Sequence, residues 1–357
     1  MRRMTLKYAK PGMVVELPVY DNFGSLLLPQ HKELDNNSIA VMTAKGVPEI
    51  FVRDYRVMDI LVAPLYSPQS EGVLANAFRQ VVQKKMSGAA VDAAGITRVF
   101  EAVNQMVRDM SLNILGDTNV SCNISAQDYV YLQPVKTAGL AMTLGQIVKL
   151  PENALAFLGM AAVFKDIGLD PAIIDKVDSI AEGCTPRMQG HPVAGYKFLL
   201  QYPLTSKEIA EAVLQHHESW SGSGYAQGLK AAEISLLARI IAIADVFVDL
   251  MAVRPGRGKY MPHEAIEYIM AGSGDQFDPQ LVEAFVRHIP SYPTGLVVHL
   301  NTGEIGIISS PKRGYVARPI VRICSTAEKG VLREPFDMDL SIAKYQRKLI
   351  TKVLEYD

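Results

Sequence analysis

The sequence predicts a mainly α-helical fold, a helical bundle with a small β-rich N-terminal domain and a small C-terminal β hairpin element. From residue 74 to about 288, apolar residues recur at spacings of three and four, which is the period of an amphipathic helix. On either side of this region, short apolar runs alternate with Gly, Pro and Asn, which form turns between strands. The chain has 357 residues, of which 49% are hydrophobic, so it can form two or three domains.

Composition shifts divide the chain into four expected segments. These are a small β-rich N-terminal domain at 1–63, a linker with leading helices at 64–124, a helical domain at 125–290, and a C-terminal β element with a final helix at 291–357. In the first segment, apolar β-prone runs lie at 13–15, 25–28, 50–52 and 60–62.

Local signals place several element boundaries. Pro151 before Glu152, and the pair His191-Pro192, are typical helix starts. Near the C-terminus, apolar runs flank the turn at 301–304, which predicts a hairpin, and a third strand follows at 319–323. The spacing of apolar residues predicts a last amphipathic helix over 341–354.

Bulk properties exclude some function classes. The formal net charge of −1 argues against general nucleic-acid binding, which usually needs a basic surface. The three widely spaced cysteines, Cys122, Cys184 and Cys324, do not resemble a disulfide framework or a zinc ribbon. No apolar signal core follows the N-terminus, and the longest apolar run, 154–164, is too short to span a bilayer. We therefore expect a cytoplasmic protein without a membrane span.

Ionisable residues continue the apolar stripes of three predicted helices. Lys165 and Asp166 follow the stripe of the first helix, His216 and His217 that of the second, and Asp245 that of the third. A buried charge or imidazole needs a partner, because desolvating it alone costs several kcal/mol. Imidazole and carboxylate are common ligands of iron, manganese and zinc. A hydrogen-bonded core network is the alternative for each residue, whereas the set together favours a metal site or a former metal site.

Four stretches of the helical region have the order and spacing of a known family's motifs. They are Lys165-Asp166-Ile167-Gly168; Gly190-His191-Pro192 with Gly195; His216-His217-Glu218 with Gly222-Ser223-Gly224-Tyr225 and Gly228-Leu229; and Ala244-Asp245-Val246-Phe247 with Arg254-Pro255 and Arg257. Over about 125–290 they resemble the HD-GYP family of cyclic-di-GMP phosphodiesterases. The resemblance implies an HD-type helical bundle, and the terminal β regions also look like segments that accompany this domain.

The resemblance also implies a metal-dependent chemistry. In the family, an early His, the His and Asp of the HD pair and a late Asp hold one metal. The HD Asp bridges to a second metal, which the HP and HH histidines bind, and both metals support hydrolysis of a cyclic-di-GMP phosphodiester. The matching residues that this chain keeps are Asp166, His191, His216, His217 and Asp245.

Six further positions depart from the family pattern, so no catalytic residue is assigned. Ser221 and Ala226 replace the Asp and Pro of the GYP signature, and Val248 replaces the Asp after Phe247. Gln133 replaces the early His, Lys165 the HD His, and Leu169 the Lys that follows the HD pair. The first metal site thereby loses two of its four ligands, while the second keeps nearly all of its set. A protonated Lys cannot ligate a metal, but Lys165 could pair with Asp166 and Asp245. Alternatively, its ammonium reaches solvent while its stem packs on the core.

The resemblance also suggests a ligand-binding set. Arg254 and Arg257 would hold phosphates, Gly224 and Tyr225 form a turn that could stack on guanine, and Lys165 contributes positive charge. An ordinary solvated basic loop is the alternative for the two arginines.

Three functions remain open. The first is a degenerate HD-GYP-type signalling protein that binds cyclic di-GMP, a related cyclic dinucleotide or a protein partner, with little or no phosphodiesterase activity. The second is a slow metal-dependent phosphodiesterase, hence a hydrolase, that uses one retained metal site. The third is a structural interaction module. The expected cofactor is one transition metal, iron or manganese, or none.

Overall fold

The structure is a computed structural model that describes residues 1–62, 66–112, 124, 128–169, 189–252, 260–312, 315 and 317–354. Its described residues divide into two compact units. One contains the N-terminal residues to Gln69 together with the C-terminal residues from Arg287, and the other contains the helices between them. The helices that follow the predicted linker therefore belong to the helical unit, and the two terminal β segments form one unit.

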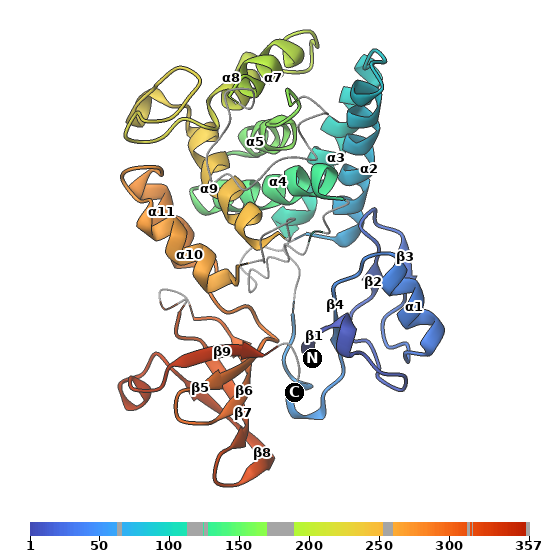
Figure 1. The fold of residues 1–357 in the computed structure, drawn as a ribbon, viewed down its shortest axis with the longest axis vertical. Coiled ribbons are helices and arrows are strands. Elements are labelled where there is room, and N and C mark those ends of the chain that lie inside the picture. The colour runs from blue at the N-terminus through green and yellow to red at the C-terminus, as the bar shows by residue number, and fades with distance from the viewer. Residues whose placement is uncertain are drawn as a thin grey trace. The chain divides into compact units, whose positions relative to one another are not determined.

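The helical unit is built around a nearly fully buried helix. Its helices are α2 (Pro68–Met86), α3 (Ala93–Leu112), α4 (Tyr129–Ile147), α5 (Glu152–Phe164), α7 (His191–Leu199), α8 (Lys207–Gln215), α9 (Leu236–Met251), α10 (Pro262–Ala271) and α11 (Pro279–His288) (Figure 1). Helix α5 packs against α3, α4, α8 and α9. Its residues from Leu158 to Phe164 are all buried, so its C-terminal end lies inside the unit.

The predicted helix starts are confirmed, and side-chain caps set two more. Pro151 is the N-cap of α5, and Pro192 occupies the first turn of α7. The hydroxyl of Ser206 accepts the N–H of Ile209 at the start of α8, and that of Ser235 accepts the N–H of Ala238 at the start of α9. Within the described residues, no helix is both long enough and apolar enough to cross a membrane.

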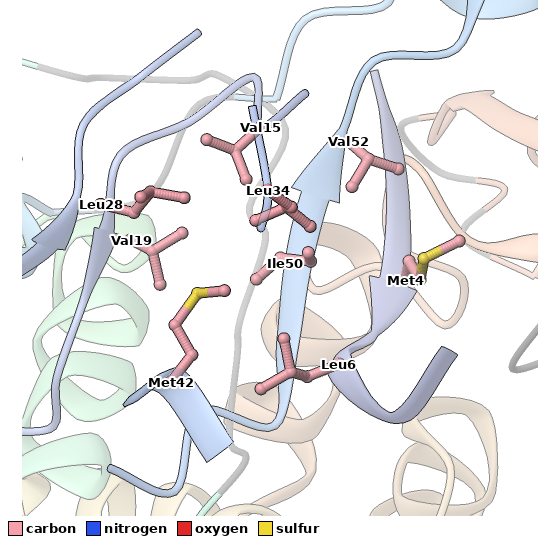
Figure 2. Packing of buried hydrophobic residues seen from close by; sticks show 9 residues of the cluster. All are labelled: Met4, Leu6, Val15, Val19, Leu28, Leu34, Met42, Ile50 and Val52. Carbon is pink, nitrogen blue, oxygen red and sulfur yellow. The ribbon is translucent and has the colours of Figure 1, made fainter. Parts of the chain in front are cut away.

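The N-terminal segment forms two small antiparallel pairs around one apolar cluster. Strand β1 (Arg2–Thr5) pairs with β4 (Glu49–Val52), and β2 (Val19–Tyr20) pairs with β3 (Leu26–Leu28). Figure 2 shows the cluster that fills the space between them, formed by Met4, Leu6, Val15, Val19, Leu28, Leu34, Met42, Ile50 and Val52. Helix α1 (Asn36–Ala44), which begins with a capping box at Asp35, supplies Met42. The apolar run 60–62 forms no strand.

The C-terminal element is a five-stranded antiparallel sheet, larger than the predicted hairpin. Its order is β8 (Gly330–Asp339), β7 (Ile320–Thr326), β6 (Ile305–Ser310), β5 (Val297–Leu300) and β9 (Ile350–Leu354). The predicted hairpin and third strand are confirmed as β5, β6 and β7. The predicted final helix over 341–354 is wrong. That segment forms a short 3-10 turn and then β9, because its β-branched end pairs with β5.

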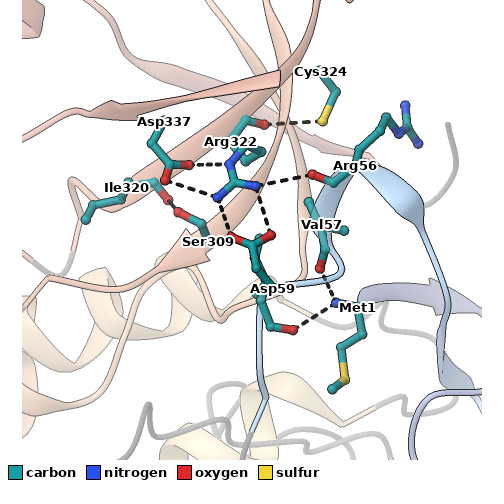
Figure 3. Close-up of polar contacts among 10 residues, drawn as sticks. Met1, Arg56, Val57, Asp59, Ser309, Ile320, Arg322, Cys324 and Asp337 are labelled. Carbon is teal, nitrogen blue, oxygen red and sulfur yellow. Dashed lines mark hydrogen bonds and ion pairs between the residues drawn. The ribbon is translucent and has the colours of Figure 1, made fainter. Parts of the chain in front are cut away.

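The two terminal segments share a core and a polar network. Val57 and Ile60 are buried in one cluster with Val297, Ile307 and Cys324. On the same sheet, Arg322 donates to both carboxylate oxygens of Asp59 at 3.0 and 2.8 Å, and also to Asp337 (Figure 3). Segments 263 residues apart in sequence are thus joined by apolar burial and by a bidentate ion pair.

Candidate metal and ligand site

Glycines bring three helix ends together at the site. A Cβ on Gly168, just after α5, would lie 2.1 Å from the carbonyl oxygen of His191 and 2.5 Å from the nitrogen of Gly195. A Cβ on Gly195 would lie 2.9 Å from Val213 on α8. Since side chains larger than hydrogen do not fit, these glycines permit the close approach of α5, α7 and α8 that places Asp166 beside the histidines.

Four predicted ligands gather at this junction. One donor atom each from Asp166, His191, His216 and His217 lies within 4.8 Å of the others. The Nε2 atoms of His191 and His216 are 3.3 Å apart, and they lie 3.3 and 3.7 Å from Oδ1 of Asp166. His191 and His216 are buried, whereas the Asp166 side chain is 24% exposed. The cluster is therefore open to solvent on the Asp166 side.

The protonation of the histidines suits metal binding. Nδ1 of His216 lies 2.7 Å from the carbonyl oxygen of Val213, which favours a proton on Nδ1 and leaves the Nε2 lone pair facing the cluster. Burial lowers the pKa of His216, and burial together with the two neighbouring imidazoles lowers the pKa of His217 well below its usual value. Neutral imidazoles and one carboxylate converging in this way fit a single transition-metal ion.

Lys165 is buried and paired, which excludes the solvent-reaching alternative. The residue is 1% exposed, and its ammonium contacts a carboxylate oxygen of Asp166 and lies 2.9 Å from Oδ1 of Asp245. Burial opposes its charge, but the two carboxylates outweigh burial and raise the pKa of Lys165. The pKa of Asp166 is held well below its usual value, against the effect of its own burial, by Lys165 and the histidines. Lys165 is therefore a permanent cation between two carboxylates.

Gln133 completes this second group. Its side-chain amide donates a 2.6 Å hydrogen bond to Oδ1 of Asp245, and the residue is 1% exposed. Asp245 thus contacts Gln133 and Lys165 and lies outside the four-donor cluster, at the first of the two metal positions that the resemblance implies. The ammonium of Lys165 and the amide of Gln133 supply the hydrogen-bond donors for Asp245.

The loop after the histidine pair, which contains Gly224 and Tyr225, contacts the cluster. The ring of Tyr225 stacks on His217, with centroids 4.8 Å apart and an interplanar angle of 25°. Sequence reasoning missed Glu218, a buried carboxylate that accepts backbone N–H groups from Gln227, Gly228 and Leu229. The sequence contained a signal for this role of Glu218. The residue directly precedes a glycine-rich loop, whose backbone N–H groups need hydrogen-bond acceptors.

Some of the other predicted positions lie among the described residues and some do not. Arg254 and Arg257 lie outside the described residues, as do Cys122 and Cys184. Leu169 ends the turn after Asp166, and its carbonyl oxygen accepts a 3.1 Å hydrogen bond from the ammonium of Lys85 on α2. The ammonium of Lys85 thus lies beside Leu169, the position where the family motif has a lysine.

Comparison with known proteins agrees with this architecture. The HD domain model matches residues 101–281, about half of the chain. A cyclic di-GMP phosphodiesterase of Pseudomonas aeruginosa is 27% identical over 281 residues, which are 76% of this chain and 65% of that protein. The cyclic di-GMP phosphodiesterase response regulator RpfG of Xanthomonas campestris pv. campestris is 26% identical over 73% of this chain and 69% of its own length.

A solved structure supports the fold. The HDG"Y"P protein Bd1817 from Bdellovibrio bacteriovorus matches with a TM-score of 0.50 and 13% identity, over 79% of this chain and 97% of that chain. The chain spans less than two thirds of the Pseudomonas protein, so the activity of that whole protein does not transfer directly. The family match, the relatives and the fold agree, and the chain belongs to the HD-domain family, alongside relatives that are named cyclic di-GMP phosphodiesterases.

Proposed function

We propose that this chain is a degenerate HD-GYP-type signalling protein that binds cyclic di-GMP or a related cyclic dinucleotide and has little or no phosphodiesterase activity. One observation carries the proposal, namely that the buried ammonium of Lys165 lies between Asp166 and Asp245. An ammonium has no lone pair and cannot serve as a ligand, and it already neutralises the carboxylates that would attract a cation. The first of the two metal sites that the family resemblance implies therefore cannot hold a metal ion in this chain, and a two-metal mechanism is excluded under this proposal.

The four-donor cluster supports one cation at most. Asp166, His191, His216 and His217 would hold a single iron or manganese ion. When bound, such an ion supplies a positive charge that polarises a phosphate oxygen. The chain's own residues orient the cluster: Val213 fixes the tautomer of His216, and Lys165 keeps Asp166 ionised. The same arrangement suits binding of a phosphodiester better than its cleavage.

The retained loop motif supports a nucleotide ligand. Gly224 and Tyr225 keep a tight turn beside the cluster, and the planar ring of Tyr225 offers a surface on which a base could stack. Arg254 and Arg257 would then contact the two phosphates, since guanidinium groups bind phosphate oxygens in a bidentate manner. These retained features favour ligand binding over a purely structural module.

A slow phosphodiesterase with one metal is the second candidate. It is favoured by the intact four-donor cluster, whose Asp166 side is open to solvent. The departures at Gln133, Lys165 and Leu169 weigh against it, because they remove two ligands and one cation of the family pattern. A protein partner is compatible with either candidate.

Calorimetric titration with cyclic di-GMP and with 3′3′-cGAMP tests the proposal. We expect at least one of them to bind. If the two arginines contact the phosphates as proposed, Arg254→Ala/Arg257→Ala should weaken binding and reduce its dependence on salt. The pair Arg108→Ala/Lys197→Ala on other helices is a charge-matched control and should leave binding unchanged. Absence of binding by the unmodified protein would instead favour the structural module. Unchanged binding by the arginine variant would remove that loop from the ligand site.

A further inference from the structure

A buried carboxylate closes the loop of residues 218–229 on itself. Glu218 is 4% exposed, and its two oxygens accept the N–H groups of Gln227, Gly228 and Leu229 at 2.6, 3.2 and 3.1 Å. Hydrogen bonds to an ionised acceptor are among the strong ones in proteins, and three of them compensate the desolvation of this charge. The far part of the loop is thereby fastened to the residue that directly follows the histidine pair.

The loop also lies directly against the backbone of that pair. The N–H of Tyr225 donates to the carbonyl oxygen of His217 at 3.1 Å. A Cβ on Gly224 would lie 2.5 Å from that same oxygen and 2.3 Å from the nitrogen of Ser219, so only glycine fits. This approach places the ring of Tyr225 in a stacked contact with the imidazole of His217.

The two neighbouring histidines are oriented by different means. Nδ1 of His216 is bonded to the Val213 carbonyl, the usual arrangement for a histidine that binds a metal through its other nitrogen. No comparable hydrogen bond to a ring nitrogen of His217 is found among the described residues. The imidazole of His217 has three ring contacts: a tilted one with His216 at 4.0 Å between centroids, an edge contact with His191 at 5.0 Å, and a stacked one with Tyr225 at 4.8 Å. Tyr225 is the one of the three that lies nearly parallel to the His217 ring and covers its face.

We infer that Tyr225 is a positioning residue for His217, and that Glu218 holds Tyr225 in place. The inference rests on the proposed metal site and deepens it, because the affinity of the site then depends on a loop that provides no ligand. The stacked ring of Tyr225 orients the imidazole of His217, as the hydrogen bond from Nδ1 to the Val213 carbonyl orients the imidazole of His216. Four residues of the loop are exposed, namely Ser223, Ala226, Gln227 and Gly228. A molecule that binds these residues would therefore change the orientation of His217 through Tyr225.

Calorimetric titration with Co²⁺ tests the inference on the full chain. Loss of an outer contact that orients a metal-binding histidine typically weakens binding by about 10-fold to 100-fold. We expect Tyr225→Leu to weaken Co²⁺ binding by about 10-fold. Tyr225→Phe keeps the ring face and should bind like the wild type. Wild-type affinity in Tyr225→Leu would overturn the inference, and so would equal losses in both variants, because the hydroxyl rather than the ring would then matter.

Two further measurements separate positioning from loss of folding. Glu218→Gln keeps the size of the side chain but removes its charge, and we expect it to weaken Co²⁺ binding while the chain still unfolds in one cooperative thermal transition, at a lower temperature because hydrogen bonds to a buried acceptor are weakened. In the metal-free protein, the tyrosine ring should shift the ring protons of His217 upfield in the NMR spectrum, in the wild type and Tyr225→Phe but not in Tyr225→Leu. Identical His217 shifts in all three proteins would refute the stacking. If the wild type takes up no Co²⁺, the proposed metal site fails, and the NMR comparison still decides the inference.

Discussion

At the scale of single residues, the cluster combines two groups with different chemistry. Three imidazoles and one oxygen of Asp166 face each other, while Lys165 and Gln133 donate to the carboxylates behind them. Asp166 belongs to both groups, since one of its oxygens faces the histidines and the other contacts the ammonium. Lys165 therefore contacts the cluster through this shared carboxylate, and its charge also acts through space on His216 and His217.

Metal content follows from this division. We predict at most one tightly bound transition metal per chain after reconstitution with iron or manganese, because the four-donor cluster is the one group of potential metal ligands found among the described residues, and Lys165 already lies at Asp245. Elemental analysis after gel filtration measures the ratio. His191→Ala should abolish it, whereas Asp245→Asn, which changes a carboxylate outside the cluster, should not raise it. Two tightly held metals per chain in the wild type would contradict the assignment.

The buried histidines predict how stability depends on pH. In the metal-free protein, burial lowers the pKa values of His216 and His217 below the value near 6.5 of an unfolded imidazole. Below that value the unfolded state binds more protons than the folded state, so the free energy of unfolding should fall as the pH drops. Urea unfolding followed by the fluorescence of the single tryptophan, Trp220, measures this free energy at pH 7.5 and 5.5.

The matched variant for this measurement is His217→Gln. It removes one of the two depressed groups, so its free energy of unfolding should change less between the two pH values than that of the wild type. A wild-type stability that is constant or higher at pH 5.5 would show that these imidazoles are not held neutral in the folded chain.

Sequence alone predicted part of this site. The spacing of Lys165, Asp166 and Asp245 on apolar stripes predicted their burial, and burial of charges required the pairing that the structure contains. The resemblance assigned Asp245 to the first metal site and the histidines to the second, but the distance between the two groups was not predictable, because helical periodicity gives the face of a residue and not the distance between helices. That distance depends on contacts such as those of Gly168, whose close approach to α7 has no periodic signal.

At the scale of elements, pairing between strands distant in sequence determined secondary structure that the local spacing of apolar residues did not predict. Residues 341–354 carry apolar side chains at helical intervals, yet Ile350, Val353 and Leu354 form an edge strand on β5. Strand β8 was missed because most of its residues are exposed and it has no clean alternation, with a register shift opposite Cys324. The hairpin of β5 and β6 was predictable, because its turn residues and strands adjoin in sequence.

The ion pairs of Arg322 predict a measurable coupling between elements. Arg322 is 15% exposed and joins the segment around Asp59 to β7 and β8, although Asp59 itself is 66% exposed. Solvent screening limits such a pair to about 1 kcal/mol. We predict that Arg322→Met and Asp59→Asn each speed amide hydrogen exchange in residues 55–60, and that the double variant adds little beyond either.

The helical unit provides the internal control for that experiment. Exchange in α4, which packs on α5 and α9, should be the same in all four proteins. Additive effects of the two substitutions on residues 55–60 would mean that Arg322 and Asp59 act independently, and the ion pair would then contribute nothing to the joining of the terminal segments.

At the scale of the whole molecule, the chain keeps the framework of its family and changes the charges inside it. The glycines, helix caps and loop that assemble the cluster are present, whereas the first metal position contains an ammonium and an amide. Stability and ligand binding depend on the framework, whereas the two-metal hydrolysis that the family resemblance implies depends on cations at both the attacking and the leaving oxygen. A chain can therefore retain the fold and lose turnover of the phosphodiester, as we propose for this protein.

The most direct test is steady-state turnover of cyclic di-GMP by the unmodified protein, supplied with iron or manganese under reducing conditions. Ordinary enzymes turn over at about 1 s⁻¹ or faster. We predict a rate far below this or no turnover, little change in Lys165→His, and a gain only in the triple variant Gln133→His, Lys165→His and Leu169→Lys. Linearisation or full hydrolysis of cyclic di-GMP by the unmodified chain at ordinary enzymatic rates would contradict the assignment of Lys165 as a replacement for the first metal.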